Sequence, residues 1–307
     1  MNVSAILDLA RERFAGVAGG EVADYIPALA EADPHLFGLA FATTGGDVSV
    51  SGAASHEVSI QSVSKPFVFA LVCQEIGEDA AREKLGANST GLPFNSVIAI
   101  ERNGTTNPMV NAGAIAATSL IPGRDREEKW DRLREGLSRF AGRDLELDRT
   151  VYESEMAANH RNRGIARLLE GHQRIYSDPD EAVDLYTRQC SLRVSARDLA
   201  VMASVLANEG VHPLSGENVL DPVHCHHVLA VMVTAGLYET SGDWLYETGL
   251  PAKSGVSGGF IGITPGVGGL GIVSPPLDPA GNSVRATAAA KWLAGELGLN
   301  IFCGKRR

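Results

Sequence analysis

The stretch "SIQSVSKPFVFALVCQEIG", residues 59–77, places a serine and a lysine at the start of a segment that is apolar on every side. A helix without a polar face belongs in a protein interior. Ser62 and Lys65 are three residues apart, so on a helix they share one face. Pro66 is compatible with a first helical turn, where N–H groups have no partner inside the helix. The sequence therefore predicts a buried helix that presents both side chains at its beginning.

This serine–lysine pair has a chemical interpretation and a structural one. A serine is a poor nucleophile until a neighbour removes its proton, and a lysine can do so when burial lowers its pKa. The positive end of a helix dipole also favours an oxyanion. The structural interpretation is a serine cap followed by a surface lysine, and an S-x-x-K pattern alone is too short to decide. The entry of Lys65 into a buried helix favours the chemical interpretation.

Strand patterns lie near both ends of the chain, and helical patterns lie between them. Residues 38–52 alternate around Gly45-Gly46-Asp47, which predicts a β-hairpin. Residues 257–278 contain two short β-rich runs around a Gly/Pro turn, and residues 285–299 form a helical pattern. We therefore predict an α+β fold with an antiparallel sheet from the N- and C-terminal parts, flanked by helices, and an inserted helical lobe.

The same pattern predicts one domain over residues 1–307. Its α/β lobe is expected from residues 1–65 plus 236–307, and its mainly helical lobe from 66–235. A length of 307 residues is sufficient for two lobes that share a core.

The composition of the chain limits the kinds of molecule that the protein is expected to bind. The net charge of −10 argues against binding to nucleic acid or to an anionic membrane, which favours a small-molecule substrate. No apolar run approaches the roughly 20 residues of a membrane span. The first 16 residues lack a signal-peptide pattern, and the four cysteines form no CxxC pair. These features predict a soluble, reduced, cytoplasmic protein.

A second motif, Lys253-Ser254-Gly255, opens the C-terminal strand region. In penicillin-recognising serine enzymes, S-x-x-K is accompanied by a K-T-G-like triplet on a strand beside the serine. A backbone N–H just after the triplet can complete an oxyanion hole with the N–H of Ser62. Together the two motifs favour a serine hydrolase.

Longer stretches, which share one order along the chain from about residue 24 to residue 270, resemble the serine-dependent glutaminase family. They are "DYIPALA", "SIQSVSKPF", "NPMVNAGAI", "SEMAANHRNRGIA", "YTRQCSL" and "GLPAKSGVSGG". The resemblance is to the short bacterial type. It implies a β-lactamase/transpeptidase-like fold and hydrolysis of the side-chain amide of L-glutamine through a seryl acyl-enzyme, without a cofactor.

The resemblance also implies roles for single residues. Ser62 matches the nucleophile, Lys65 its base, and Tyr238 a proton relay; whether Lys65 or Tyr238 is the main base stays open at this point. The oxyanion hole is expected from the N–H groups of Ser62 and Val256. Glu155 suits the ammonium of glutamine, and neutral donors suit its carboxylate. The expected substrate-binding residues are Ser62, Asn111, Glu155, Asn162, Tyr186, Tyr238, Val256 and Tyr25.

Three other stretches carry no function in this interpretation. "LGANSTGLPFNS" (85–96) matches the family only loosely, so no role is assigned there. The "HCHH" cluster (224–227) supplies too few ligands for zinc, and partly exposed helix residues are expected instead. "GVGGLG" (266–271) satisfies GxGxxG but is not followed by a helix, which argues against dinucleotide binding. We expect no metal and no cofactor.

Two alternatives remain at this stage. A β-lactamase or penicillin-binding transpeptidase would share the serine and the triplet, but an export signal and an S-D-N motif are missing. A non-catalytic amino-acid-binding protein would keep the pocket, but the intact Ser62, Lys65 and triplet argue against it. The expected partner is L-glutamine, with no nucleic acid and no membrane, and self-association into a dimer or tetramer is expected for an enzyme of this size.

Overall fold

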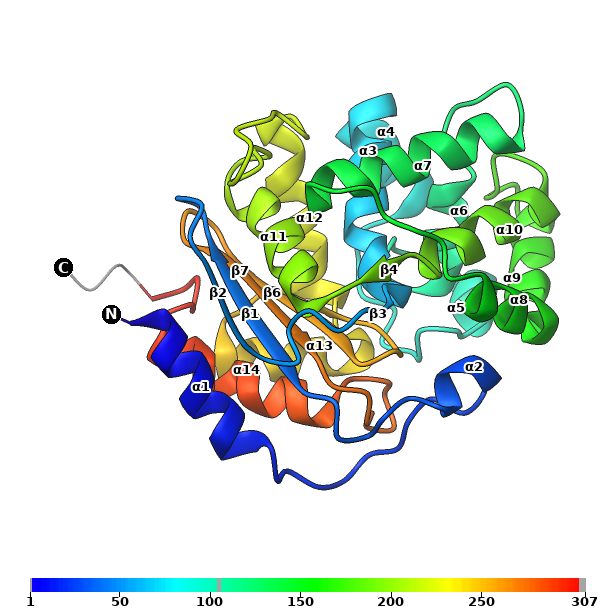
Figure 1. Ribbon diagram of the computed structural model, residues 1–307. Coiled ribbons are helices and arrows are strands. Elements are labelled where there is room, and N and C mark those ends of the chain that lie inside the picture. Colours follow the sequence, from blue (N-terminus) through cyan, green and yellow to red (C-terminus); the bar gives the residue numbers. More distant parts are fainter. Residues whose placement is uncertain (1, 104–105, 304–307) are drawn as a thin grey trace.

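The computed structural model describes residues 2–103 and 106–303, and its centre is a five-stranded antiparallel sheet with strand order β2-β1-β7-β6-β5 (Figure 1). The strands are β1 (Gly38–Thr43), β2 (Val48–Gly52), β5 (Ala252–Ser254), β6 (Gly259–Thr264) and β7 (Gly268–Val273). The N-terminal hairpin β1–β2 and the C-terminal hairpin β6–β7 meet through β1 and β7. The prediction of a sheet from both ends of the chain is confirmed.

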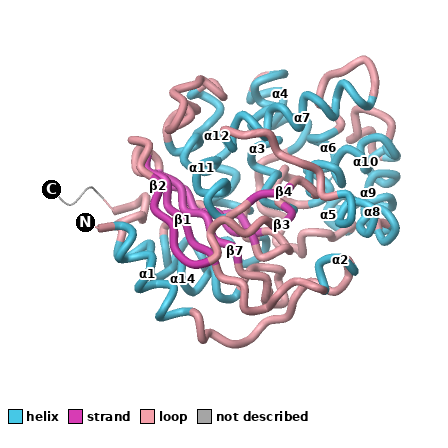
Figure 2. The backbone as a smooth tube through the Cα atoms, in the orientation of Figure 1, coloured by secondary structure: helices cyan, strands magenta, loops and turns pink. Residues whose placement is uncertain are grey.

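Helices cover both faces of the sheet (Figures 1 and 2). Helices α1 (Val3–Phe14) and α14 (Val284–Glu296) pack on one face, and α11 (Ala196–Ala207) packs on the other. Within the described residues, no helix combines the length and the apolar character that crossing a bilayer requires.

The alternation of β1 explains why both faces are buried. Leu39 and Phe41 join the hydrophobic cluster with α1 and α14, whereas Ala40 and Ala42 join the cluster with α11. Successive side chains of a strand point to opposite faces, so one strand supplies both cores. The small alanines let the backbone of α11 approach the sheet.

The remaining elements form the helical part beside the sheet (Figure 1), except for α13 (Ser241–Thr248), which packs against α14 on the face covered by α1. They are α2 (Pro27–Ala30), α3 (Ser64–Ile76), α4 (Glu78–Leu85), α5 (Ile98–Asn103), α6 (Asn111–Thr118), α7 (Arg126–Ala141), α8 (Arg149–Ala158), α9 (His160–Gly171), α10 (Pro179–Cys190), α12 (Pro222–Ala235) and α13, with 3-10 turns η1 (Gln61–Val63) and η2 (Tyr238–Thr240) and the short strand pair β3 (Val58–Ser59) and β4 (Arg193–Val194).

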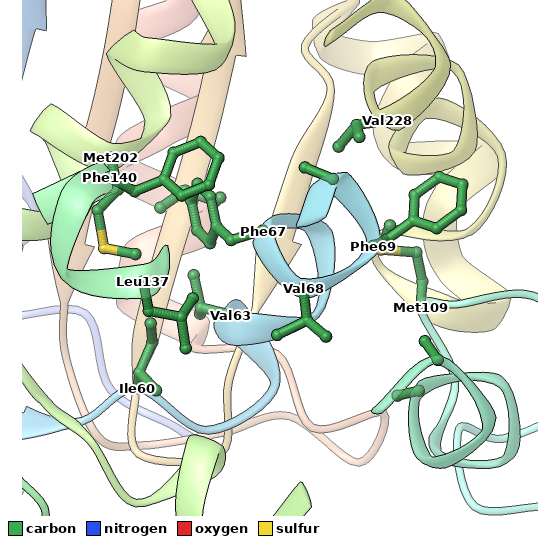
Figure 3. Close-up of a cluster of buried hydrophobic side chains, with 14 of the residues drawn as sticks. Ile60, Val63, Phe67, Val68, Phe69, Met109, Leu137, Phe140, Met202 and Val228 are labelled. Carbon is green, nitrogen blue, oxygen red and sulfur yellow. The ribbon is translucent and has the colours of Figure 1, made fainter. Parts of the chain in front are cut away.

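Helix α3 occupies the middle of the larger hydrophobic core, as its apolar sequence predicts. Phe67 packs against Phe140 of α7 with ring centroids 5.1 Å apart. On the other side of the helix, Phe69 lies beside Met109 (Figure 3). Side chains on opposite sides of α3 are therefore buried, and the beginning of this helix is fixed against α7 and α6.

Glycines of β7 determine how closely α11 approaches the sheet. A Cβ added at Gly271 would lie 2.2 Å from Ala196 O and 2.5 Å from Ala200 N, both in the backbone of α11. A Cβ added at Gly269 would lie 2.5 Å from Ala200 O. Two glycines of "GVGGLG", Gly269 and Gly271, thus serve helix–sheet packing. Because α11 lies within 66–235 yet covers the sheet, the division into lobes stays a prediction.

We predict that Gly271→Ala lowers the free energy of unfolding by about 3 kcal/mol, because a methyl group at this position overlaps the backbone of α11. Urea denaturation followed by circular dichroism measures the change. Gly164→Ala in α9 is the matched control, since no atom lies within 4 Å of its added Cβ, and a gain of about 0.5–1 kcal/mol is expected there. Equal effects of the two substitutions would contradict this account of the packing.

Candidate active site

A cavity of about 270 Å³ opens where the start of α3 meets α6, α8, α9 and α10. Seven of the nine residues expected at the site line it, and Lys65 and Tyr238 are buried next to it. The lining residues are Tyr25, Ile26, Gln61, Ser62, Phe94, Asn95, Asn111, Glu155, Ala158, Asn159, Arg161, Asn162, Tyr186 and Val256.

Ser62 lies in the 3-10 turn η1, directly before α3. The preceding residue, Gln61, has a φ of 49°, in the left-handed region that non-glycine residues rarely adopt. Ser64 Oγ donates a hydrogen bond of 2.8 Å to Gln61 O and helps to hold this turn. Such local strain persists only where surrounding contacts enforce it, and it is often found at functional sites.

Lys65 connects the serine to a buried network of amides. Its Nζ donates to Ser62 Oγ at 2.9 Å and to Asn111 Oδ1 at 2.8 Å. Tyr186 OH donates to the same Asn111 oxygen at 3.2 Å, and Asn111 Nδ2 donates to Asn162 Oδ1 at 3.0 Å. The structure therefore places five of the expected site residues in one hydrogen-bonded chain.

The environment of Lys65 favours a neutral amine. The side chain is only 1% exposed, and burial lowers its pKa to about 8, although the Cys190 thiol and the Glu155 carboxylate oppose the shift. Taking an ammonium out of water disfavours its charged form. An amine with this pKa, hydrogen-bonded to a serine hydroxyl, can accept the proton of that serine.

Glu155 on α8 is the carboxylate that lines the cavity. Burial raises its pKa to about 7, while a hydrogen bond from Gln61 Nε2 at 3.4 Å and the charge of Lys65 oppose the shift. A carboxylate in this position suits a cationic group of a ligand, whose charge would keep Glu155 ionised.

Tyr238 is held between an aromatic ring and a lysine. Its ring centroid lies 5.0 Å from that of Phe94 and 4.0 Å from Lys253 Nζ, and its φ of 58° is left-handed. Burial raises its pKa to about 12, although the nearby hydroxyls of Ser62 and Ser254 oppose the shift. The phenol therefore keeps its proton at neutral pH.

The triplet Lys253-Ser254-Gly255 begins on β5, beside the serine turn, as expected. Lys253 is fully buried, and its Nζ donates to Ser254 O at 2.8 Å. Burial and the charge of Lys65 hold the pKa of Lys253 well below its usual value. A Cβ added at Gly255 would lie 3.0 Å from Ile60 O, so the strand end packs tightly against the turn that carries Ser62.

Several lining residues were not anticipated from the sequence. Gln61 and Asn159 contribute buried amides, and Phe94 and Asn95 come from the stretch to which no role was assigned. Arg161 Nε donates to Asn95 O at 2.8 Å and connects this stretch to α9. Proximity to Ser62 was the only sequence signal for Gln61. Tyr25 lies at the mouth of the cavity and is 55% exposed.

The "HCHH" cluster lies away from this cavity, on α12. The expectation of partly exposed side chains is wrong for His224 and Cys225, which are buried, and correct for His227. Over residues 2–103 and 106–303, no group of three or more His, Cys, Asp or Glu residues is placed to hold a metal ion.

Known proteins resemble this chain over nearly its whole length. The family model described as Glutaminase matches residues 20–302. Glutaminase 2 of Yersinia pestis is 55% identical over 302 residues, which cover 98% of this chain and 89% of the relative. The glutaminase of Colwellia psychrerythraea is 49% identical and covers 98% of this chain and 97% of its own length.

A solved structure described as probable glutaminase ybaS superposes with a TM-score of 0.96 at 42% identity, covering 98% of both chains. The expected β-lactamase-like α+β fold is confirmed by this match. With a family model over nearly the whole chain and relatives of this similarity, the chain belongs to the glutaminase family.

Proposed function

We propose that this protein hydrolyses the side-chain amide of L-glutamine to L-glutamate and ammonia through an acyl-enzyme on Ser62. The observation that carries the proposal is the hydrogen bond of 2.9 Å between Lys65 Nζ and Ser62 Oγ, at the edge of a cavity that also contains a buried carboxylate. Family membership supports the substrate, and the Ser62–Lys65 pair supports the mechanism. A cytoplasmic location and a dimeric or tetrameric assembly stay predictions from the sequence.

In the first step, Lys65 accepts the proton of Ser62 while Oγ attacks the side-chain carbonyl carbon of glutamine. The N–H groups of Ser62 and Val256 are the proposed donors to the oxyanion that forms. Loss of one such donor typically reduces the rate by about 10²–10³. Their proximity is supported by the tight packing of Gly255 against the turn that carries Ser62.

The tetrahedral intermediate then loses its C–N bond. The proton taken from Ser62 passes to the departing nitrogen, which leaves as ammonia, and a glutamyl ester of Ser62 remains. Water attacks this ester, Lys65 accepts the proton of the water, and the ester C–O bond breaks as Ser62 regains a proton. Glutamate is released and the enzyme returns to its starting state.

The pKa values support Lys65 as the base. At neutral pH, part of an amine with a pKa of about 8 is neutral and can accept a proton. A phenol with a pKa of about 12 is almost never ionised at that pH and so cannot serve as the base. Tyr238 is better suited to donate a proton to the departing nitrogen. We therefore propose Lys65 as base and Tyr238 as proton relay.

The polar groups of the cavity suit a free amino acid. Glu155 can pair with the α-ammonium of glutamine. Asn162 accepts from Asn111 through Oδ1, so its Nδ2 can donate to the α-carboxylate together with Tyr25. A site of this kind rejects analogues that leave its buried polar groups unpaired.

Two solved relatives contain ligands of this chemical class. A structure described as Mglu in its glutamate form has a TM-score of 0.94 at 39% identity and is covered over 71% of its length. A probable glutaminase from Bacillus subtilis was solved with 6-diazo-5-oxo-L-norleucine, at a TM-score of 0.90 and 29% identity. That compound has the amino-acid end of glutamine and an electrophilic diazoketone near the position of the amide.

We predict that Ser62→Ala reduces ammonia release from L-glutamine by at least about 10³-fold, because the acyl-enzyme cannot form. A coupled ammonia assay measures the rate, with L-asparagine as control substrate and thermal melts to establish folding. Wild-type protein treated with 6-diazo-5-oxo-L-norleucine should carry the label on the peptide that contains Ser62. Normal activity of the folded variant would exclude the proposed mechanism. An inert wild type that hydrolyses a β-lactam reporter would favour the alternative enzyme.

The pH dependence of kcat/KM should rise from about pH 6 to about pH 9. Glu155 must be ionised to hold the ammonium and has a pKa of about 7, and Lys65 must be neutral to act as base and has a pKa of about 8. Each of these two groups reaches its active form by losing a proton. Activity therefore increases with pH until the substrate ammonium itself deprotonates. A profile that falls between pH 6 and pH 8 would contradict these roles.

Lys65→Met should abolish activity and yet stabilise the fold at pH 7, by about 2 kcal/mol. The pKa of Lys65 falls from 10.5 to about 8 on folding, so the unfolded chain binds the proton more tightly; the resulting penalty on folding is complete below pH 8 and decreases between pH 8 and pH 10.5. Lost hydrogen bonds to Ser62 and Asn111 offset part of the gain.

Urea denaturation at several pH values tests this prediction, and the gain should vanish as the pH rises toward 10.5. Lys291→Met is the matched control, because Lys291 is about half exposed and pairs with Glu247 at the surface. Lys291→Met should change the free energy of unfolding by no more than about 0.5 kcal/mol. A destabilised Lys65→Met at pH 7 would show that burial of this amine carries little cost.

A further inference from the structure

Asn159 lines the cavity but has no role in the mechanism above. It is the residue between α8 and α9, and only 5% of it is exposed. It caps the end of α8 and follows Glu155 of that helix by four residues, so the two side chains lie one turn apart on one side.

The orientation of the Asn159 amide follows from its anchor on α10. Thr187 Oγ1 donates its proton to Val183 O at 2.8 Å, so toward Asn159 it can only accept. Asn159 Nδ2 is the donor, at 2.8 Å. The NH₂ group of the amide therefore faces Thr187, which is fully buried and is not part of the cavity lining.

The carbonyl oxygen of Asn159 is available to accept a hydrogen bond from a ligand in the cavity. Among the described residues, none donates a hydrogen bond to Oδ1, and this oxygen is not among the fully enclosed polar atoms that lack a partner. Ala158 and Glu155 line the same wall. This wall therefore presents an acceptor from Asn159 and a carboxylate, one helical turn apart.

The chemistry of this wall favours a cation with several N–H donors. The last carbonyl groups of a helix carry partial negative charge, and α8 ends at Ala158, beside Asn159. Gln61 already donates to Glu155 Oε2, which leaves Oε1 for a ligand. An ammonium group has three donors and needs more than one acceptor when it is taken out of water.

We propose that Asn159 is a specificity-determining residue that accepts a hydrogen bond from the α-ammonium of the substrate, beside Glu155. This inference rests on the proposed glutaminase function and deepens it, because it assigns a second group to recognition of the amino-acid end. The α-ammonium is remote from the amide that reacts. Loss of Asn159 should therefore raise KM and leave kcat nearly unchanged.

The decisive experiment compares L-glutamate with glutarate, which has the same two carboxylates and no ammonium. Isothermal titration calorimetry measures both affinities for the wild type and for Asn159→Leu, a substitution of similar size without an acceptor. We expect about tenfold weaker binding of L-glutamate, since hydrogen bonds to charged groups are stronger than neutral ones, and less than about twofold change for glutarate. Equal losses for both ligands, or no loss for either, would overturn the proposal.

Thr187→Val is the second variant, because it removes the acceptor that orients the Asn159 amide without changing the cavity lining. It should weaken L-glutamate binding by about threefold and spare glutarate, and thermal melts should show both variants folded. If Asn159→Leu does not fold, the same comparison with Thr187→Val decides the proposal.

Activity assays separate this inference from the function on which it rests. A wild type that neither hydrolyses L-glutamine nor binds L-glutamate would refute the proposed function, and the role of Asn159 with it. A wild type with normal glutaminase activity, together with an Asn159→Leu variant whose KM is unchanged, would refute the role of Asn159 alone.

Discussion

The buried amine of Lys65 is the constraint on which the rest of the structure depends. A lysine that is 1% exposed is tolerated because burial lowers its pKa to about 8 and because its amine donates to Ser62 Oγ and Asn111 Oδ1. Helix α3 also packs against α6 and α7, which fixes the backbone that carries the amine. The hydrophobic core and the reactive pair are therefore parts of one arrangement.

Asn111 extends this arrangement to the surrounding helices. It accepts from Lys65 and Tyr186 and donates to Asn162, so α3, α6, α9 and α10 are joined at one side chain. The sheet contributes from the other side, where β5 ends against the turn that carries Ser62. Side chains on rigid helices and a strand hold the site more precisely than side chains on mobile loops would.

Local patterns in the sequence were sufficient to predict the main secondary-structure elements but not the whole site. The hairpin around Gly45, the buried α3 and the pair Ser62–Lys65 followed from short-range periodicity and spacing. Glu155 was expected only through the family resemblance, because no local sequence pattern distinguishes a functional glutamate on a helix from a surface one. The role inferred for Asn159 depends on Thr187, 28 residues further along the chain, and this contact exists only after α8 and α10 pack. The close contact of α11 with the β7 glycines is likewise a property of the tertiary structure.

The charges of the site connect binding to catalysis in the proposed function. The Glu155 carboxylate raises the pKa of Lys65, so in the free enzyme it favours the protonated amine, which is the inactive form of the base. A substrate ammonium beside Glu155 offsets this charge with its own positive charge, which lowers the pKa of the amine. Arrival of an amino acid would then convert Lys65 into the base that Ser62 requires. An amide without an α-ammonium would fill the cavity and leave the base protonated, which gives the enzyme a second reason, beyond affinity, to discriminate against it.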